Sequence, residues 1–409
     1  MKTIKFLLAS LFTCSILFTS LTTKAQVGKL KIDTIGHSDR NLFDENDGSG
    51  RSQRMFPYPI IFVHGLAGDW YSWGVLGDML YNASFPYGGQ LEYCLNSDES
   101  NFSANQSSDI LTFVPQNLPA ADFYDINFDC NPNGNCFSGS TQNTVLSNQA
   151  AIVKQGIALG HAINAVLQAT GRNKVILMGH SMGGLCIREY LQNPNLWPDT
   201  QHHVAKIITS GTPHGGSNAT TVGLTSLIDG VEEQSEAMRD LRESYVASGY
   251  YAPYLFGGIE DDLYVQNSLF WSYYNVDVNC NGSEGNNVVG LNQKALYTDL
   301  DIAIIRSDYN WLLNGGDGVV DDENADLTNY YSGIPDYEKF WCSDHNNNSH
   351  SDYSHTAMPE DLWVDMKGLD EPDDYHLSYE IEIGESYKGF ITIQGQNANY
   401  TDDFDDYIL

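Results

Sequence analysis

Residues 175–190 read VILMGHSMGGLCIREY, and this stretch decides which fold the chain is expected to adopt. Four apolar residues lead into GHSMGG, and a helical pattern follows at once. The segment fits G-x-S-x-G at Gly179, Ser181 and Gly183, in the strand-then-helix context of a nucleophile elbow. Glycines on both sides leave room for the strained backbone that exposes a serine hydroxyl. The alternative is a turn serine that only caps the helix.

Strands and helices are predicted to alternate around this stretch. Apolar runs at YPIIFVHG, KVILM and VAKIITSG predict buried strands, and spacing near 3.6 predicts helices over 145–170 and 182–192. Gly171 is the expected C-terminal cap of the first helix. This order predicts an α/β fold with a parallel sheet covered on both faces. Residues 81–144, rich in Asn, Ser, Gly and Tyr, are expected to be surface loops with short strands.

A loop after the first strand offers the second donor that an oxyanion hole needs. His64-Gly65 follows that strand, and the N–H of Leu66 is expected to pair with the N–H of Met182. A plain glycine turn is the alternative, and His64 is interpreted as a residue that positions the loop. Trp70 and Trp73 are candidates either for an acyl pocket or for the core.

The N-terminus carries the three regions of a secretory signal peptide. Two lysines precede an apolar run, and small residues at 23 and 25 place a cut before Gln26, so residues 1–25 are predicted to be removed. A membrane anchor is the weaker alternative, because Ser and Thr interrupt the short run. We therefore expect a secreted or periplasmic protein without a stable membrane anchor.

The charge balance limits the partners of this protein. The 409 residues include 53 acidic and 20 basic ones, for a formal net charge of −33. Such a surface repels phosphate backbones and anionic headgroups, so no nucleic-acid binding is expected. The oligomeric state is left open.

Export also implies an oxidising compartment for the cysteines. Cys130 and Cys136 flank a tight segment and are candidates for a small disulfide loop, whereas Cys186 is expected to pack as a buried hydrophobe. That assignment leaves one of the remaining three unpaired: Cys94, Cys280 or Cys342.

Three successive stretches carry a family resemblance. PIIFVHGLAGDW, VILMGHSMGG and IITSGTPHGGS, all within residues 59–217, resemble the signature stretches of α/β-hydrolase lipases and esterases. They are similar in particular to bacterial lipases, including triacylglycerol lipases, and to the family of inositol deacylases of lipid anchors. The resemblance implies a doubly wound, mostly parallel sheet and serine ester hydrolysis, with no cofactor required. It also implies a catalytic triad in the order Ser, Asp, His.

That order points to an acid and a base late in the chain. The family's acid often lies in a DGVV-like turn, which here contains Asp317, with Asp321 and Asp322 as rivals. The same segment is alternatively a solvated acidic or calcium loop. The family's histidine precedes a final helix, as His355 does, whereas His345 and His350 lie in a polar stretch. His214 precedes the acid and is interpreted as structural.

The chain is divided accordingly into a catalytic domain over 26–370 and a short β-rich extension over 371–409. The alternation breaks at 217–275, which is predicted to be a helical lid or cap insertion. In the extension, YEIEIGESYKGFITIQG alternates like a β-hairpin.

Two D-x-N-x-N-G segments match the first half of a calcium loop, although neither has a glutamate at the twelfth position. Calcium is the optional cofactor at these segments, and an Asx turn is the alternative. The candidate ligands are Asp129, Asn131 and Asn133 in one segment and Asp277, Asn279 and Asn281 in the other.

The resulting hypothesis is a secreted serine hydrolase of lipase or esterase type, with an ester or lipid as its substrate. Two alternatives are an acyltransferase or amidase with the same triad, and a non-catalytic binding protein on a hydrolase fold. The acyl chain, the alcohol portion and the mobility of the insertion are left open.

Overall fold

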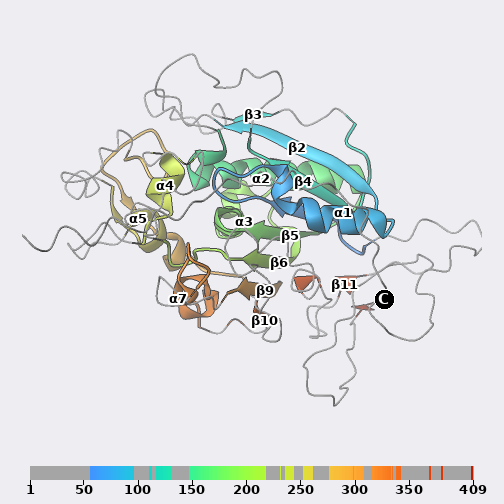
Figure 1. The fold of residues 1–409 in the computed structure, drawn as a ribbon. Coiled ribbons are helices and arrows are strands. Elements are labelled where there is room, and N and C mark those ends of the chain that lie inside the picture. The colour runs from blue at the N-terminus through green and yellow to red at the C-terminus, as the bar shows by residue number, and fades with distance from the viewer. Residues whose placement is uncertain are drawn as a thin grey trace, which may run out of the picture. The chain divides into compact units, whose positions relative to one another are not determined.

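The computed structural model describes residues 56–95, 110–112, 117–129, 147–217, 231, 235–243, 252–260, 276–297, 299–307, 316–332, 334, 338–341, 368–369, 379–380 and 407–408. One sheet of eight strands dominates these residues, in the order β10-β9-β6-β5-β1-β4-β2-β3 (Figure 1). Every neighbouring pair is parallel except β2 and β3, which are antiparallel. The strands are β1 (Ile60–Val63), β2 (Tyr87–Leu95), β3 (Ile110–Thr112), β4 (Phe123–Asn127), β5 (Val175–His180), β6 (Val204–Ser210), β9 (Asp301–Arg306) and β10 (Glu338–Trp341).

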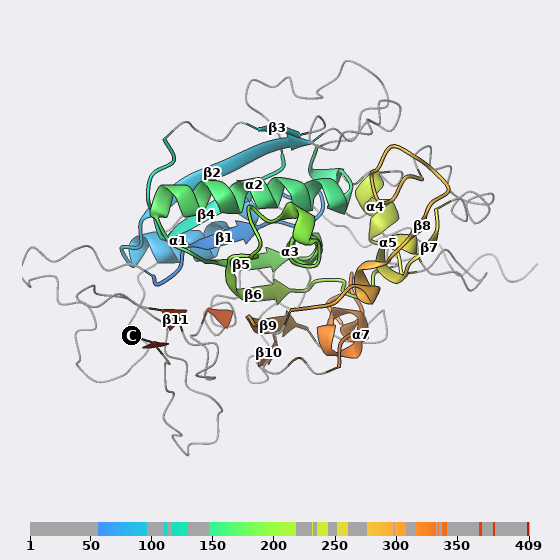
Figure 2. The same ribbon diagram turned by 180° about the vertical axis from the view of Figure 1, so that it is seen from behind.

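Helices cover both faces of this sheet, as predicted. Helix α1 (Gly74–Asn82) lies on the face seen in Figure 1, and α2 (Ile152–Thr170) and α3 (Met182–Leu191) lie on the face seen in Figure 2. Along each strand the side chains alternate between the two faces. Ile61 and Leu177 accordingly pack in the core with α2 and α3, whereas Phe62 and Met178 pack with α1. The mostly parallel, doubly wound α/β sheet is therefore confirmed.

Local sequence signals account for the central elements. Residues 60–63 and 175–178 are apolar throughout and fully or almost fully buried, as expected of strands covered on both faces. Helix α2 ends where Gly171 adopts a φ of 70° and its N–H donates to the carbonyl of Leu167. This left-handed cap is the one that the glycine predicted.

The prediction for residues 81–144 was wrong in one respect. β2 is nine residues long, and β4 lies inside the sheet between β1 and β2. Polar residues hid these strands, because Asp125 and Asn127 occupy positions of β4 that are nevertheless buried. In β2, an added Cβ on Gly88 would lie 1.9 Å from the ring of Tyr124, so the glycine permits close packing of the two strands.

The described part of the insertion packs firmly against the body. Within 217–275 the helices are α4 (Glu236–Asp240) and α5 (Pro253–Phe256), and the strand is β7 (Gly258–Ile259), which pairs with β8 (Asn287–Val288). Their apolar side chains form a third core cluster with the first turns of α2 and α3. Figure 2 shows α4 and α5 beyond the ends of α2 and α3. The role of 217–275 as a lid or cap stays a prediction.

Only two short strands of the C-terminal extension lie among the described residues. β11 (Tyr379–Glu380) pairs in parallel with β12 (Tyr407–Ile408), and Tyr379 is buried against Tyr58 of the body. The predicted hairpin over 379–395 begins with β11, and its remaining residues lie outside the described part of the chain, as does the predicted signal peptide. Among the helices that the structure describes, none is both long and apolar enough to cross a bilayer.

The described residues also contain several short helices. The 3-10 segments are η1 (Trp70–Trp73), η4 (Ser147–Gln149), η5 (Pro194–Leu196), η9 (Leu291–Gln293) and η10 (Leu327–Asn329), and α7 spans Asp322–Ala325.

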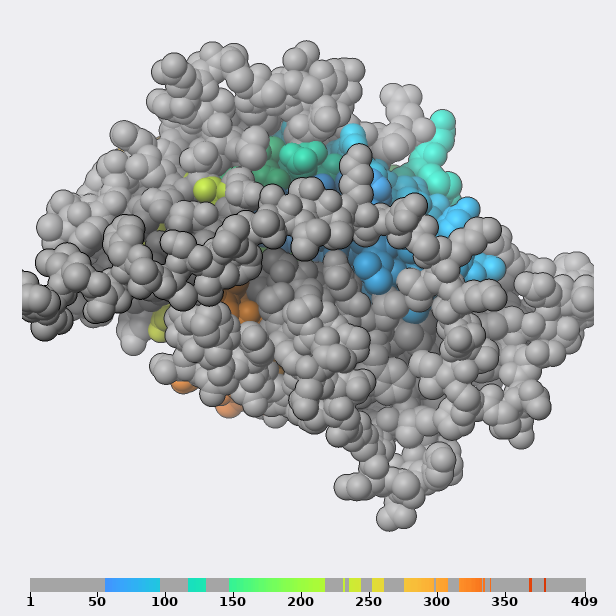
Figure 3. All heavy atoms as spheres, viewed as in Figure 1, coloured from blue at the N-terminus to red at the C-terminus, as the bar shows by residue number. Residues whose placement is uncertain are grey.

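Atoms of the first described segment, 56–95, reach the surface on the face shown in Figure 3. Tyr71 and Tyr81 in this segment are among the most exposed large hydrophobic residues, at 61% and 66%.

Cys186 and Cys280 are both buried. Cys186 packs among the apolar residues between α3 and the sheet, as predicted. Burial raises the pKa of both thiols, so neither is a reactive thiolate. Cys130, Cys136 and Cys342 lie outside the described residues, and a disulfide framework stays a prediction.

Candidate active site

Ser181 lies at the sharp junction between β5 and α3. Its backbone has a φ of 54° and a ψ of −126°, a conformation that costs energy for any residue with a side chain. The turn is held by a hydrogen bond of 2.8 Å from the N–H of Ser181 to the carbonyl of Ser210, at the end of β6. The serine makes no side-chain capping bond to α3, so the contact expected of a simple helix cap is absent here.

The glycines that flank this serine are required by direct contacts. A Cβ on Gly179 would lie 2.7 Å from backbone atoms of Gly183 and Gly184. A Cβ on Gly183 would lie 2.4 Å from the carbonyl oxygen of Val63, at the end of β1. These distances are shorter than a carbon atom tolerates, so the elbow closes only with glycine on both sides of Ser181.

The loop after β1 lies directly against the serine. A Cβ on Gly65 would stand 2.8 Å from the Cβ of Ser181. The N–H of Gly68 donates to the carbonyl of Gly65 at 3.1 Å, and Ala67 has a φ of 53°, so residues 65–68 form a tight turn with Leu66 inside it. The loop that the sequence singled out for the oxyanion hole therefore borders the candidate nucleophile.

The two proposed oxyanion donors are unengaged within the described part of the chain. Neither the N–H of Leu66 nor that of Met182 has a hydrogen-bond partner among these residues. Met182 is the first residue of α3, where a helix leaves its N–H groups without internal partners. The side chain of Met182 is fully buried and accepts a hydrogen bond from Gln155 through Sδ at 3.5 Å. Only its N–H is left for a ligand.

His64 holds the same loop in place through hydrogen bonds of its ring. The N–H of Phe128 donates to Nε2 at 3.0 Å, so the ring proton is on Nδ1, which donates to the carbonyl of Gly65 at 2.8 Å. Burial lowers the pKa of His64 to about 4, and the ring is neutral at pH 7. Both nitrogens are occupied, which is the arrangement expected of a positioning residue.

The two tryptophans of this loop differ in their surroundings. Trp73 is 1% exposed, stacks on Phe62 and donates from Nε1 to the carbonyl of Val63, so it belongs to the core. Trp70 is 37% exposed and packs edge-on against Tyr71. Only Trp70 is still available to contact a substrate.

Asp317 lies in a turn that orients its carboxylate. Its Oδ1 accepts from the N–H groups of Val319 and Val320 at 2.8 and 2.7 Å, and the side chain is 4% exposed. Gly316 and Gly318 have φ values of 96° and 91°, which explains the glycines of NGGDGVV. These two hydrogen bonds fix Oδ1, and the planar carboxylate then sets the direction of Oδ2.

The loop after β6 connects this turn to the nucleophile's neighbourhood. The hydroxyl of Ser217 donates to the carbonyl of Val319, and the N–H of Gly215 donates to the carbonyl of Asn324. β6 pairs with β5 on one side and β9 on the other, and all three are parallel. Ser181 and the loop that holds the Asp317 turn therefore belong to the carboxyl edge of the sheet, where α/β folds place their sites.

The rival acids have other partners. Asp322 lies 3.3 Å from Nε of Arg306, on the short helix α7. Asp321 is only partly buried, and its pKa is raised by burial and by the charge of Asp317. Asp317 is the one of the three that the turn both buries and orients.

His355, the predicted base, lies outside the described residues, as do its alternatives His345 and His350. Its role stays a prediction. His214 is fully buried, and burial together with the charge of Arg188 lowers its pKa well below the usual value. It contacts Thr209 and Arg188 through its two nitrogens.

Of the calcium candidates, only one segment is described throughout. Both oxygens of Asp277 accept backbone N–H groups, from Asn281 at 3.1 Å and Gly282 at 2.6 Å. The side-chain oxygens of Asn279 and Asn281 likewise accept from Asn281 and Ser283. These contacts are those of an Asx turn. No cluster of three or more His, Cys, Asp or Glu side chains suited to a metal occurs among the described residues.

The other segment is only partly described. Asp129 donates its N–H to Oδ1 of Asn127 and accepts from Nδ2 of the same residue through its carbonyl. Burial and the nearby charge of Asp69 raise the pKa of Asp129. Asn131 and Asn133 lie outside the described residues, so calcium binding there stays a prediction.

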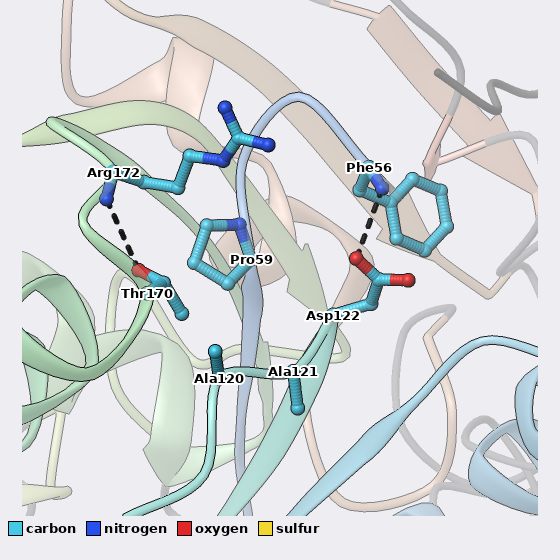
Figure 4. A pocket seen from close by; sticks show the side chains of 7 residues that line it. All are labelled: Phe56, Pro59, Ala120, Ala121, Asp122, Thr170 and Arg172. Carbon is cyan, nitrogen blue, oxygen red and sulfur yellow. Dashed lines mark hydrogen bonds between the residues drawn. The ribbon is translucent and has the colours of Figure 1, made fainter. Parts of the chain in front are cut away.

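A small pocket lies at the opposite edge of the sheet (Figure 4). It is lined by residues that precede β1 and β4 and by residues at the end of α2: Phe56, Pro59, Ala120, Ala121, Asp122, Thr170 and Arg172. Asp122 accepts from the N–H of Phe56 at 3.0 Å, so its carboxylate ties two strand entries together. The pocket is therefore separate from the elbow, which follows the carboxyl end of β5.

The elbow on a parallel sheet, between helices on both faces, defines an α/β-hydrolase fold. Residues 55–267 match the model of the PGAP1-like alpha/beta domain, over more than half of the chain. The chain belongs to this family.

Solved structures of similar proteins include lipases. The product of gene lin2722 from Listeria innocua is 14% identical, with a TM-score of 0.40, and the match covers 81% of this chain and 97% of that one. The mature lipase BlEst2 of Bacillus licheniformis is 16% identical, with a TM-score of 0.36 and coverages of 77% and 91%. Lipase B of Aspergillus fumigatus is 14% identical, with a TM-score of 0.36 and coverages of 78% and 54%. The family assignment rests on the match over 55–267.

Proposed function

We propose that this protein is a secreted serine hydrolase that cleaves carboxylic esters, with acyl or lipid esters as its substrates. One observation carries the proposal: Ser181 has a strained backbone, with a φ of 54°, and lies against Gly65 of the loop that holds Leu66. A turn serine without a function has no need of this strain.

In the proposed mechanism, Oγ of Ser181 attacks the ester carbonyl carbon while His355 accepts the hydroxyl proton. The N–H groups of Leu66 and Met182 donate to the resulting oxyanion, each worth about 3 kcal/mol of barrier. His355 then protonates the leaving alcohol. Water attacks the acyl-enzyme while His355 accepts its proton, and His355 returns that proton to Oγ of Ser181 as the acid leaves. Asp317 holds the imidazole in the required tautomer and stabilises the imidazolium.

The described contacts support a water-poor site. Met182 belongs to the apolar cluster that joins α2 and α3 to the insertion, and the partly buried Leu66 packs against this cluster. Apolar surroundings strengthen hydrogen bonds to a developing charge, because little water competes for them. They also suit an acyl group better than a charged substrate.

The test replaces Ser181 and measures hydrolysis of p-nitrophenyl esters from acetyl to palmitoyl. Ser181→Ala is expected to abolish turnover and labelling by a fluorophosphonate probe, while the circular dichroism spectrum and Tm stay close to those of the wild type. Ser283→Ala, which changes an exposed serine in the Asp277 loop, is the matched control and should retain full activity.

Full activity of a clean Ser181→Ala preparation would exclude the proposal. Absence of both turnover and labelling in the wild type would instead favour a binding protein on a hydrolase fold. Addition of alcohols or amines as acceptors, with product analysis, separates hydrolysis from acyl transfer.

A further inference from the structure

Arg188 is a fully buried cation in the helix that carries the nucleophile. It lies seven residues after Ser181 in α3, about two helical turns further on, with an exposed fraction of 0%. Its guanidinium donates four hydrogen bonds. Nε donates to Gln192 at 3.0 Å, Nη1 to Nδ1 of His214 at 3.3 Å, and Nη2 to Asn292 at 2.8 Å and to the hydroxyl of Tyr331 at 2.7 Å.

All four of these partners are uncharged. A guanidinium can only donate, so Nδ1 of His214 accepts and the ring proton is on Nε2, next to Thr209. His214 is therefore neutral. The adjacent carboxylate, Glu189, bonds instead to Tyr254 and Lys294. Arg188 thus has no carboxylate partner within the described part of the chain. An apolar side chain at this position would avoid the cost of desolvating a charge.

Gln192 caps the end of α3 itself, and the other three partners come from separate elements. His214 lies in the loop after β6, and its carbonyl accepts from Nδ2 of Asn292, in η9, at 2.9 Å. Tyr331 follows η10 and also bonds to Gln192 and to the carbonyl of Leu291. Arg188 thus joins the nucleophile helix to three segments that are distant in sequence.

Two of these segments lead to the turn of Asp317, one through direct hydrogen bonds and one along the chain. The loop of His214 continues into Ser217, which bonds to Val319 of that turn, and into Gly215, which bonds to Asn324 of the adjoining helix α7. Tyr331 lies near the end of the described run 316–332, which begins with the same turn, and its N–H donates to the carbonyl of Leu327. The guanidinium therefore contacts His214, in the loop that bonds to the acid turn, and Tyr331, which follows that turn in the chain.

We infer that Arg188 is a positioning residue for the candidate acid. It fixes Asp317 relative to Ser181 by holding the two segments around the acid turn against the nucleophile helix. This inference rests on the proposed function. A planar fork with several donors at fixed angles sets such an orientation, whereas the single ammonium of lysine does not.

The expected signature is a loss of kcat that depends on Asp317. Arg188→Lys should lower kcat by about 10- to 100-fold, because small displacements of catalytic groups cost rates of this order. KM should change by less than about threefold, because no contact to the substrate is removed. In an Asp317→Asn background the same replacement should lower kcat by less than about threefold, since the group it positions no longer functions.

A purely structural role would produce another pattern. Arg188→Lys would then lower kcat by the same factor with and without Asp317, or would lower only the amount of folded protein. Either result overturns the inference, as does full activity of Arg188→Lys. Lys294→Gln, which removes an ion pair with Glu189 on the same helix, is the control and should leave kcat unchanged.

Tyr331→Phe keeps the inference testable if Arg188→Lys does not fold. This variant removes one hydroxyl from the network and leaves the cation in place, and its loss of kcat should likewise vanish in the Asp317→Asn background. Retained turnover in Ser181→Ala would overturn the proposed function together with the inference. Turnover that requires Ser181, with factors that multiply across the two backgrounds, overturns the inference alone.

Discussion

At the scale of single residues, the elbow depends on backbone contacts that leave no space for side chains. Ser181 adopts a positive φ, and Gly183 lies against the carbonyl of Val63. Met182 stands between them and contributes its N–H, while its side chain packs in the third core cluster. The three consecutive positions therefore tolerate substitution to very different degrees.

We expect Gly183→Ala to be far more damaging than Met182→Leu. The added Cβ would lie 2.4 Å from the carbonyl oxygen of Val63, and overpacking of this kind costs about 1–3 kcal/mol. It also displaces α3 from the loop of Leu66, so kcat should fall at least tenfold. Met182→Leu conserves volume and should cost less than about 1.5 kcal/mol, with kcat within a few-fold of the wild type.

Urea unfolding and p-nitrophenyl ester kinetics measure both effects. Equal damage from the two replacements would show that the side chain of Met182 contributes to catalysis or that Gly183 has room for a methyl group. Neither result is compatible with the contacts described above.

At the scale of elements, α4 provides the N-terminal cap of α2. The N–H groups of Ala151 and Ile152, at the start of α2, donate to the carboxylates of Glu236 and Asp240. Negative charge at this end of a helix is favourable because the helix dipole is positive there. Lys154 completes the arrangement with a fully buried ion pair to Glu236 at 2.9 Å. This part of the insertion is therefore anchored to the body.

Glu236→Gln should destabilise the protein by about 3–5 kcal/mol, because it removes the negative charge that faces the buried ammonium of Lys154. The double variant Glu236→Gln with Lys154→Met removes both charges and should recover much of that loss. Chemical denaturation measures the free energy of unfolding of the three proteins. A single variant as stable as the wild type would mean that α4 detaches readily and belongs to a mobile lid.

The Asp277 loop is expected to be independent of calcium. Its carboxylate oxygens already accept two backbone N–H groups, and Glu260 accepts the N–H of Val278 in the same loop. Removal of calcium with EGTA should therefore change Tm by less than about 1 °C and leave ester hydrolysis unchanged. A fall in Tm that added calcium reverses and magnesium does not would contradict this expectation.

At the scale of the whole molecule, buried ionisable groups give stability a dependence on pH. Burial in β4 raises the pKa of Asp125 from 3.8 to about 7, so its neutral form is favoured in the folded state. The stability that this group contributes is complete below about pH 4 and is lost as the pH rises to about 7. Burial of His64 acts in the opposite sense, because its pKa is lowered to about 4. Its contribution is lost as the pH falls from about 6.5 to 4.

The difference between the wild type and Asp125→Asn isolates one of the two groups. Asp125→Asn should become more stable relative to the wild type as the pH rises from 4 to 7, by an amount on the order of a few kcal/mol. Urea unfolding at several pH values provides the measurement. A difference that is constant over this range would show that Asp125 titrates alike in the folded and unfolded chains.

Many strands, helices and turns of this molecule are determined by short stretches of its sequence. The apolar runs of β1, β5 and β6 and the apolar spacing of α2 and α3 identify these elements, because a strand or helix covered by a core must be apolar along the covered face. The glycines around Ser181 and Asp317 identify the two turns, since only glycine supplies the required φ or the required space. The family signatures follow from the same local requirements.

Contacts between distant segments were decided by the tertiary structure alone. β4 contains Asp125 and Asn127 and is central only because β1 and β2 pair with it. The carboxylates of α4 find their N–H donors more than eighty residues earlier in the chain, at the start of α2. Arg188 meets Tyr331 across 143 positions. Hydrogen bonds and ion pairs of this kind leave no periodic trace in a sequence, because each depends on which segments the completed sheet brings to its carboxyl edge.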